Sequence, residues 1–152
     1  MYMHITMAKE LDLAVMENCV CFNLRAISRA ITQFYVAELG QHGLLPTQTP
    51  ILTALSAHPD ATMAQLSEWL GMDRTTLVRN LRPLERDRLV RLSGKGRGGK
   101  VSLALTTKGQ AALIRLLPDW LAAQRAVVKT LGAKRWTTIL ADLERAATAL
   151  QK

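Results

Sequence analysis

The ten residues that decide how this chain folds lie near its middle: Ala64-Gln65-Leu66-Ser67-Glu68-Trp69-Leu70-Gly71-Met72-Asp73. They follow Thr62, whose hydroxyl oxygen can accept a bond from a free N–H while Gln65 returns one, which is the spacing of a capping box. This pattern predicts a short helix that ends at Gly71, a natural left-handed stop. Asp73 then caps a second helix. In that helix, apolar side chains at helical spacing predict a buried stripe, formed by Leu77, Leu81 and Leu84.

After the second helix the spacing of the apolar residues changes from helical to strand-like. Residues 89–92 and 101–105 are predicted to form two short strands, and the second alternates apolar and small residues. The segment between them, residues 93–100, holds only Ser, Gly, Lys and Arg, so it is predicted to be a flexible basic hairpin. Two short helices at a tight turn, followed by such a hairpin, form a winged helix-turn-helix.

Long helical segments flank this motif. Apolar residues fall at helical spacing over residues 11–39, before two glycines that end the helix. Thr106 caps a second long helix, in which Pro118 predicts a kink, and Gly132 separates it from a last helix. The predicted fold class is therefore mainly α with a small β-wing, in a single domain over residues 1–152.

The positive charge of the chain is concentrated in one segment. The 152 residues carry a net charge of +8, and residues 74–100 hold nine basic and two acidic side chains, which is +7 of that total. Such a cluster favours a polyanionic partner. Aromatic residues make up only 5% of the chain, which argues against a module that stacks bases on exposed rings. Charge and composition together favour double-stranded DNA.

The residue types in this segment suit DNA. Arg and Asn carry the forked donors and acceptors that read guanine and adenine edges, and Thr can bond a phosphate or pack on a thymine methyl. Basic residues on a glycine-rich hairpin can follow the backbone or reach a minor groove. The candidate DNA-binding residues are Arg74, Thr75, Thr76, Arg79, Asn80 and Arg82 on the second helix, with Lys95, Arg97 and Lys100 on the hairpin.

Several classes of function are excluded. The first seven residues are too short and too polar for a secretory signal, and the uncharged segment 39–59 is broken by prolines and glycines, so it is no membrane span. Two cysteines cannot build a disulfide framework or a four-cysteine zinc site, and the three histidines lack metal-ligand spacing. No paired carboxylates, activated nucleophile or nucleotide loop stands out. We therefore expect a cytoplasmic protein that is not an enzyme and has no metal, cofactor or membrane partner.

Three stretches give the chain a resemblance to the MarR family of transcriptional regulators: residues 64–73, Leu84-Glu85-Arg86-Asp87-Arg88-Leu89-Val90, and Leu105-Thr106-Thr107-Lys108-Gly109. The resemblance implies a winged helix-turn-helix lobe over residues 46–106. It also implies dimerisation helices over residues 11–40 and 107–151, which interlock in a homodimer on a pseudo-palindromic operator. Their apolar stripes, too extensive for one small winged domain, would be buried across the two-fold axis. The predicted function is a sequence-specific regulator, a repressor that a small ligand or an oxidant releases.

The chain departs from the family pattern in three places. Arg88 stands where relatives place Gly, and a left-handed conformation there costs about 1 kcal/mol. The hairpin lacks the acid that commonly holds the wing arginine, which leaves the register of Arg97 open. Pro83 removes one backbone bond within the second helix and is expected to bend it. A winged-helix module that binds protein or RNA without operator specificity stays the alternative function.

The two cysteines are candidates for the signal. Cys21 precedes Phe22 as in the organic-hydroperoxide-sensing branch of the family, and the resemblance assigns Tyr35 to bonding the thiolate. Arg25 stands where that branch has a second tyrosine, and an arginine nearby could lower the pKa of a thiol. Cys19 is the second candidate; on a helix it would point about 200° away from Cys21, which disfavours a disulfide between them.

Two other interpretations of the cysteines and of the predicted helix over residues 11–39 stay open. Cysteine is also a common small core residue, so both cysteines could serve packing alone. A phenolic or carboxylate ligand between the dimer helices and the DNA-binding lobe would be typical of the family. Arg25 and Arg29 are the candidate anchors for such a ligand.

Overall fold

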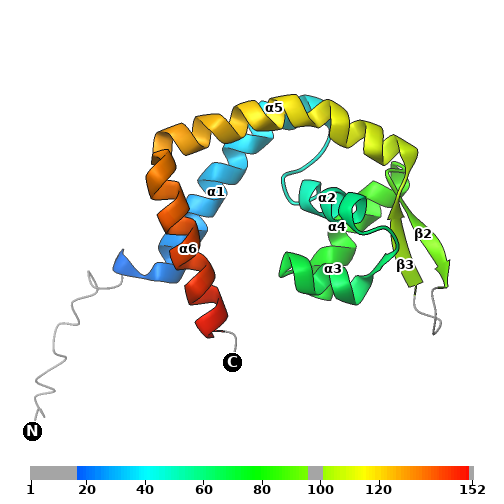
Figure 1. The fold of residues 1–152 in the computed structure, drawn as a ribbon, viewed down its shortest axis with the longest axis horizontal. Coiled ribbons are helices and arrows are strands. Elements are labelled where there is room, and N and C mark those ends of the chain that lie inside the picture. Colours follow the sequence, from blue (N-terminus) through cyan, green and yellow to red (C-terminus); the bar gives the residue numbers. More distant parts are fainter. Residues whose placement is uncertain (1–16, 96–100, 151–152) are drawn as a thin grey trace, which may run out of the picture. The chain divides into compact units, whose positions relative to one another are not determined.

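A computed structural model of the chain describes residues 17–95 and 101–150. The chain divides into two compact units, residues 1–34 and residues 35–152, and each unit is described by itself. The sheet and five of the described α-helices belong to the second unit (Figure 1). The boundaries predicted for the DNA-binding lobe and the dimerisation helices stay predictions.

The first helix, α1, spans Val20–Leu39, so it begins later than the predicted start at residue 11. Residues 11–16 lie outside the described part of the chain, but residues 17–19 are described and precede the helix. The side chain of Asn23 donates from Nδ2 to the carbonyl oxygens of Glu17 and Cys19 at 2.8 and 3.0 Å. A side-chain amide that bonds the preceding backbone competes with helical bonds, which explains the later start.

The predicted two-helix motif is confirmed, with its caps. The helix α3, Met63–Leu70, begins at a capping box: Gln65 N donates to Thr62 Oγ1 at 3.3 Å, and Thr62 N donates to Gln65 Oε1 at 2.9 Å. Gly71 ends it with a φ of 59°. The next helix, α4, spans Arg74–Arg86, and Asp73 caps it by accepting a bond from Thr76 N at 2.8 Å. The helix α2, Thr49–Ala57, precedes both.

The wing is a three-stranded antiparallel sheet in the order β1-β3-β2. Strand β3 spans Val101–Leu105 as predicted, whereas β2 spans Val90–Lys95 and continues past the predicted end at residue 92. Strand β1, Ala61–Thr62, was not predicted, because two residues are too short to show an alternating pattern. Its backbone pairs with β3, with Ala61 opposite Leu103, so β1 ties the start of α3 to the wing.

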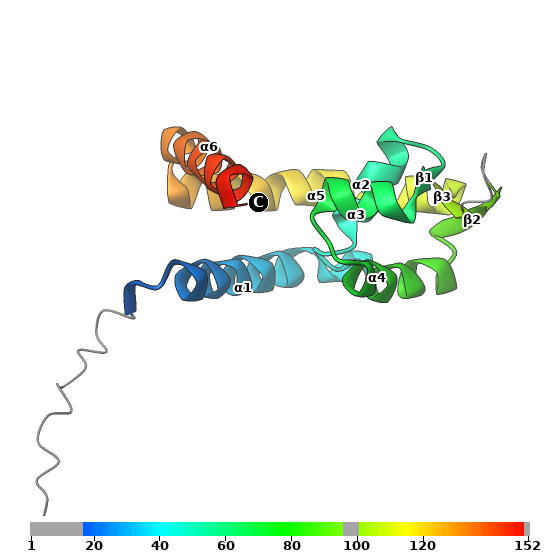
Figure 2. The same ribbon diagram turned by 90° about the horizontal axis from the view of Figure 1, so that it is seen from below.

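The core of the second unit lies where α2, α3, α4, β3 and α5 meet, a lobe seen from two sides in Figures 1 and 2. Side chains from all five elements are almost fully buried in it, which removes their apolar surface from water and fixes the angle between α3 and α4. The largest of these side chains are Ile51, Leu52, Leu55, Leu66, Leu77, Leu84, Leu103 and Leu116. The predicted stripe of α4 is thus confirmed as core.

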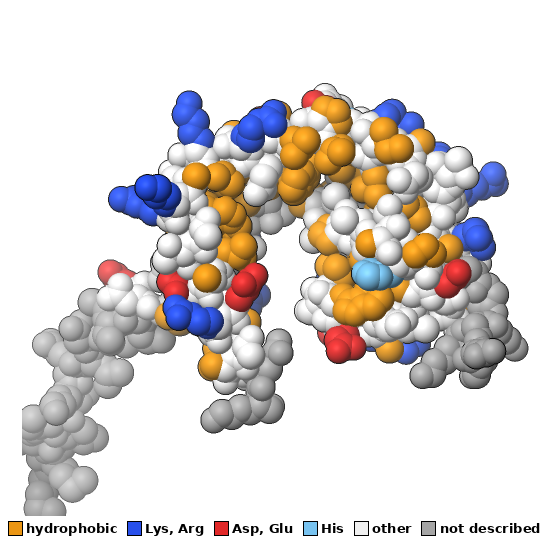
Figure 3. All heavy atoms as spheres, in the orientation of Figure 1, with side chains coloured by type: hydrophobic (Ala, Val, Ile, Leu, Met, Phe, Trp, Pro, Cys, Tyr) orange, Lys and Arg blue, Asp and Glu red, His pale blue; other side chains and the backbone are white. Residues whose placement is uncertain are grey.

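Two long helices complete the chain. The helix α5, Thr107–Leu131, is capped by Thr106 as predicted and continues as one helix on both sides of Pro118. Gly132, with a φ of 85°, separates it from α6, Ala133–Leu150. Over its described span α6 has no buried residue, and Figure 3 shows hydrophobic side chains in a run along it. The exposed apolar side chains of this helix include Ile139, Leu140, Leu143 and Leu150.

Helix α4 ends in a Schellman motif built on an arginine. Leu89 N donates to Leu84 O at 2.8 Å and Arg88 N donates to Glu85 O at 2.9 Å. Arg88 is left-handed, with a φ of 59°, so the helix ends as it would with the family's glycine in spite of the cost expected for an arginine. For a residue with a Cβ this conformation costs about 1 kcal/mol, so other contacts must hold the turn in place.

Those contacts come from the first turn of α5 and bind three successive carbonyl groups. Lys108 Nζ donates to Asp87 O at 2.9 Å, Thr106 Oγ1 donates to Arg88 O at 2.7 Å, and Thr106 N donates to Leu89 O at 3.0 Å. Gly109 packs against the same backbone, and a Cβ there would lie 2.2 Å from Leu89 O. We call these contacts the α4–α5 junction.

The junction predicts that Gly109→Ala destabilises the fold. Because the added methyl group would meet the backbone of Leu89, which cannot move aside as a side-chain end can, in addition to Leu105 Cδ1, we expect the free energy of unfolding to fall by about 1–3 kcal/mol. Urea denaturation followed by circular dichroism measures this change. The matched control is Gly40→Ala, where a Cβ would meet nothing within 4 Å and the expected change is about 0.5 kcal/mol or less. Equal losses in the two variants would contradict the tight junction.

Candidate nucleic-acid interface

One side of α4 carries an exposed row of four polar side chains, formed by Thr75, Arg79, Arg82 and Arg86. At 3.6 residues per turn, these four positions fall within a sector of about 60°. The buried leucines of the helix lie on the opposite side. We call these four residues the α4 row. It presents three guanidinium groups and one hydroxyl to solvent on a single helical face.

The remaining predicted residues of α4 differ in their surroundings. Arg74 is exposed in the first turn of α4, outside the sector of the α4 row, whereas Thr76 and Asn80 are half-buried and bonded within the chain. Thr76 Oγ1 donates to Asp73 Oδ2 at 2.7 Å. Asn80 Nδ2 donates to Thr76 O at 2.9 Å, and its Oδ1 accepts a bond from Thr47 Oγ1 at 2.8 Å. In this arrangement the two side chains fix the start of α4 and the loop before α2.

Electrostatics reinforce the ends of α4. Hydrogen bonds from the hydroxyl and backbone of Thr76 hold the pKa of Asp73 below its usual value, so this cap stays ionised at neutral pH. A negative charge at a helix N-terminus is favourable. At the other end, hydrogen bonding from Arg86 lowers the pKa of Asp87, and hydrogen bonding to Asp87 raises the pKa of Arg86.

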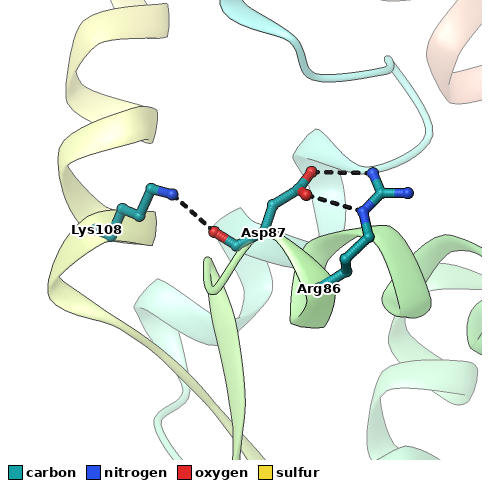
Figure 4. A network of polar contacts seen from close by, with 3 residues as sticks. All are labelled: Arg86, Asp87 and Lys108. Carbon is teal, nitrogen blue, oxygen red and sulfur yellow. Dashed lines mark hydrogen bonds and ion pairs between the residues drawn. The ribbon is translucent and has the colours of Figure 1, made fainter.

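Arg86 is the residue of the α4 row that the predicted DNA-binding set omitted. Its Nε and Nη2 donate to Oδ1 and Oδ2 of Asp87 at 3.0 and 3.3 Å, while Lys108 bonds the Asp87 carbonyl (Figure 4). The carboxylate therefore orients the guanidinium, and the junction holds the carboxylate's own backbone. The spacing from Arg79 and Arg82, seven and four residues back, was the available signal in the sequence.

Within the described residues, the wing adds the backbone of its strands and one exposed basic side chain to the candidate interface. Lys95 ends β2, and nothing of its side chain is described; Arg97 and Lys100 lie outside the described residues. Arg91 on β2 is exposed, and it too was missing from the predicted set. The DNA-binding role that the sequence analysis gave to Lys95, Arg97 and Lys100 therefore stays a prediction.

The candidate redox residues fall in both units. Cys19 and Cys21 are free and exposed, and they belong to the first unit. Because Cys19 precedes the first helical residue, Val20, the separation of 200° expected for two helical residues does not apply to this pair. Tyr35 belongs to the second unit, where its hydroxyl donates to Gln124 Oε1 and burial raises its pKa. Their part in sensing stays a prediction.

The second unit also contains an apolar pocket of about 630 Å³, whose lining residues the sequence did not predict. The end of α1, the start of α2 and the middle of α5 supply most of its wall. Its lining residues are Tyr35, Leu39, Pro46, Thr49, Pro50, Thr53, Ala54, Leu70, Leu113, Leu116, Leu117 and Trp120. Arg25 and Arg29, the predicted ligand anchors, are exposed on α1 and are not among these lining residues.

Other kinds of site find no support among the described residues. Within residues 17–95 and 101–150, no group of three or more His, Cys, Asp or Glu side chains could hold a metal ion. His42 pairs instead with Asp119, Nε2 to Oδ2 at 2.8 Å. None of the described helices is long and apolar enough to cross a membrane.

Comparison with known proteins gives a consistent picture. A model of the MarR family matches residues 42–99. The crystal structure of the M. tuberculosis transcriptional regulator MosR is 36% identical, with a TM-score of 0.76, and the match covers 88% of this chain and 98% of MosR. A structure of MosR in complex with DNA is 35% identical, with a TM-score of 0.77 and coverage of 88% and 99%.

A more distant match shows the fold alone. The PcaV transcriptional regulator from Streptomyces coelicolor, solved in complex with its natural ligand, is 20% identical with a TM-score of 0.80, and the match covers 90% of this chain and 96% of PcaV. No curated protein matches the chain.

Proposed function

Because the chain belongs to the MarR family of winged helix-turn-helix transcriptional regulators, we propose that it acts as a homodimer on a pseudo-palindromic operator, as a repressor that a ligand or an oxidant releases. That the chain is a DNA-binding transcriptional regulator, and not an enzyme, follows from the family itself. The observation that carries the finer proposal is the α4 row, which offers three guanidinium groups on one exposed helical face.

The α4 row suits readout of bases in a major groove. An arginine fork matches the O6 and N7 acceptors of guanine, and one good bidentate pair is worth about 1–3 kcal/mol of discrimination. The solved complex of MosR with DNA supports a duplex as the partner of this chain. We propose as DNA contacts the nine predicted residues together with Arg86: Arg74, Thr75, Thr76, Arg79, Asn80, Arg82, Arg86, Lys95, Arg97 and Lys100.

The exposed apolar side chains support the homodimer. On α6, Ile139, Leu140 and Leu143 are each about 40% exposed, and on α1 both Phe22 and Ile27 are more than half exposed. Pairing such stripes across a two-fold axis would bury them and present two copies of α4 to one duplex. Two reading helices about 34 Å apart would then face successive major grooves.

The pocket supports control by a ligand. Four of its lining residues, Leu113, Leu116, Leu117 and Trp120, lie on α5, the helix whose first turn holds the end of α4 through the junction. A ligand that favours one position of α5 would therefore bias the position of α4 as well. Such coupling between a ligand and DNA requires only that the ligand bind one arrangement better than the other.

We expect Arg79→Ala to relax sequence preference. Since Arg79 lies in the middle of the α4 row, its loss should weaken binding to a duplex selected from a random pool by about 10–100-fold, and binding to random duplex much less. Fluorescence anisotropy on both duplexes measures this. The matched control is Arg115→Ala, which removes an exposed arginine of α5 and should leave the ratio of the two affinities unchanged.

A second variant separates base readout from backbone contact. Lys100→Ala should weaken binding to both duplexes by a similar factor, and it should reduce the slope of log affinity against log salt concentration by about 1. If Arg79→Ala and Lys100→Ala act alike on both duplexes, α4 does not read bases. Equal affinity of the unaltered protein for selected and random duplex would favour the alternative, a winged-helix module without operator specificity.

We also propose Cys21 as the site of oxidant sensing, with Cys19 and Tyr35 as its candidate partners, because both thiols are exposed and free. The Cys21 thiolate would attack the peroxide O–O bond, forming a sulfenic acid and releasing an alcohol. Cumene hydroperoxide should then lower the DNA affinity of the unaltered protein and of Cys19→Ser, but not of Cys21→Ser. Peroxide sensitivity that persists in Cys21→Ser would dismiss this role.

A further inference from the structure

We infer that Arg88, in the turn between α4 and β2, is a further DNA contact, and that it binds a phosphate group beside the groove that the α4 row is proposed to read. Arg88 is not among the ten contacts proposed above. The inference rests on the proposed function in one respect, which is that α4 is the helix that meets the duplex.

The backbone of Arg88 has a conformation that is unfavourable for an arginine. Only two residues other than glycine have a positive φ within the described part of the chain, Asp60 at 63° and Arg88 at 59°. An aspartate tolerates this left-handed conformation because its short polar side chain can bond the nearby backbone. An arginine lacks that compensation, and a glycine would form the same turn without strain. An unfavourable residue at such a turn points to a role for its side chain.

Within the described residues, the side chain of Arg88 has no polar partner. It is exposed, and its guanidinium group makes no hydrogen bond or ion pair there. The adjacent acid, Asp87, is already engaged by Nε and Nη2 of Arg86 at 3.0 and 3.3 Å (Figure 4). Arg86 also supplies the cation that the dipole favours in the last turn of α4. The guanidinium group of Arg88 is therefore free to bind an anion outside the chain.

The position of Arg88 suits a phosphate rather than a base. Arg86, the last residue of the α4 row, lies two residues before it, and the exposed Arg91 of β2 lies three residues after it. In helix-turn-helix proteins the N-terminal part of the reading helix contacts the base edges. The turn after the C-terminal end of that helix therefore lies toward the edge of the groove, which the sugar–phosphate backbone borders. A guanidinium fork matches the oxygens of a phosphate group.

The backbone on both sides of Arg88 is held by hydrogen bonds. Arg88 N donates to Glu85 O at 2.9 Å, and Arg88 O accepts a bond from Thr106 Oγ1 at 2.7 Å. The α4–α5 junction thus offsets the unfavourable φ without using the side chain. A guanidinium group that starts from a fixed backbone loses less freedom when it binds a phosphate, so the contact is partly preorganised.

Three substitutions separate the charge of Arg88 from its backbone conformation. Arg88→Lys keeps both the charge and the strain, Arg88→Ala removes only the charge, and Arg88→Gly removes both. We expect Arg88→Ala and Arg88→Gly to weaken binding to selected and random duplex by a similar factor of about 3–10, and to reduce the slope of log affinity against log salt concentration by about 1, because one phosphate contact is lost. Arg88→Lys should keep the slope of the unaltered protein.

Fluorescence anisotropy over a series of salt concentrations measures these affinities and slopes. The matched control is Arg115→Ala, which removes an equally exposed arginine from the third turn of α5 and should leave the slope unchanged. Thermal unfolding followed by circular dichroism gives a second readout. Arg88→Gly should raise Tm by about 2–4 °C, because it relieves the strain, although it weakens DNA binding. Arg88→Ala, which keeps the strain, should not raise Tm.

The outcomes separate this inference from the function on which it rests. If the unaltered protein binds neither duplex, the proposed function fails and the inference fails with it. If the protein binds the selected duplex and Arg88→Ala leaves its affinity and salt slope unchanged, the inference is overturned while the proposed function stands. A slope that falls equally in Arg88→Lys would also overturn it, since the loss would not follow the charge. A lower Tm in Arg88→Gly would contradict it as well, because Arg88 would then serve the fold.

Discussion

The close approach of Gly109 to the carbonyl of Leu89 is the contact on which the arrangement of this lobe depends. Only a residue without a Cβ lets the first turn of α5 reach the backbone at the end of α4. Once there, Thr106 and Lys108 bond three successive carbonyl groups of the turn that follows α4, those of Asp87, Arg88 and Leu89. These bonds help to hold Arg88 in its left-handed conformation. The end of α4 and the start of α5 are therefore packed against each other as one corner.

This corner lies between the two surfaces on which the proposed function depends, the α4 row and the pocket. The α4 row lies on one side of it, and α5 continues from it into the core and the pocket wall. The first turn of α5 is bonded directly to the turn that ends α4, so a displacement of α5 would be passed to α4 through these contacts. In the proposed function, ligand and DNA would be coupled through packed secondary structure, and a ligand could shift the equilibrium only as far as it prefers one arrangement of the corner.

Local signals in the sequence predicted most of this architecture. The caps at Thr62, Asp73 and Thr106 each depend on a short polar side chain at a fixed spacing, and such bonds form between near neighbours. The leucine stripe of α4 followed from helical periodicity in the same way. The family resemblance supplied the function, which local patterns alone left as a basic winged domain.

What the sequence did not predict depends on contacts between distant residues or on a single side chain. The pocket combines residues from Tyr35 to Trp120, which no local pattern links. The start of α1 is set by the amide of Asn23, which bonds two earlier carbonyls. Arg86 was counted with the basic segment, and its spacing from Arg79 and Arg82 could have placed it in the α4 row; the orientation that Asp87 gives its guanidinium could not be predicted.

The central claim is that two copies of α4, each fixed to its own α5, are held at one spacing. The most direct measurement is the affinity of the protein for its selected duplex as the two half-sites are moved apart. Inserting about five base pairs, roughly half a turn, places the second half-site on the opposite face of the duplex. The affinity should then fall to that of a duplex with a single half-site. Affinity that is independent of the insertion would contradict a rigid pair of reading helices.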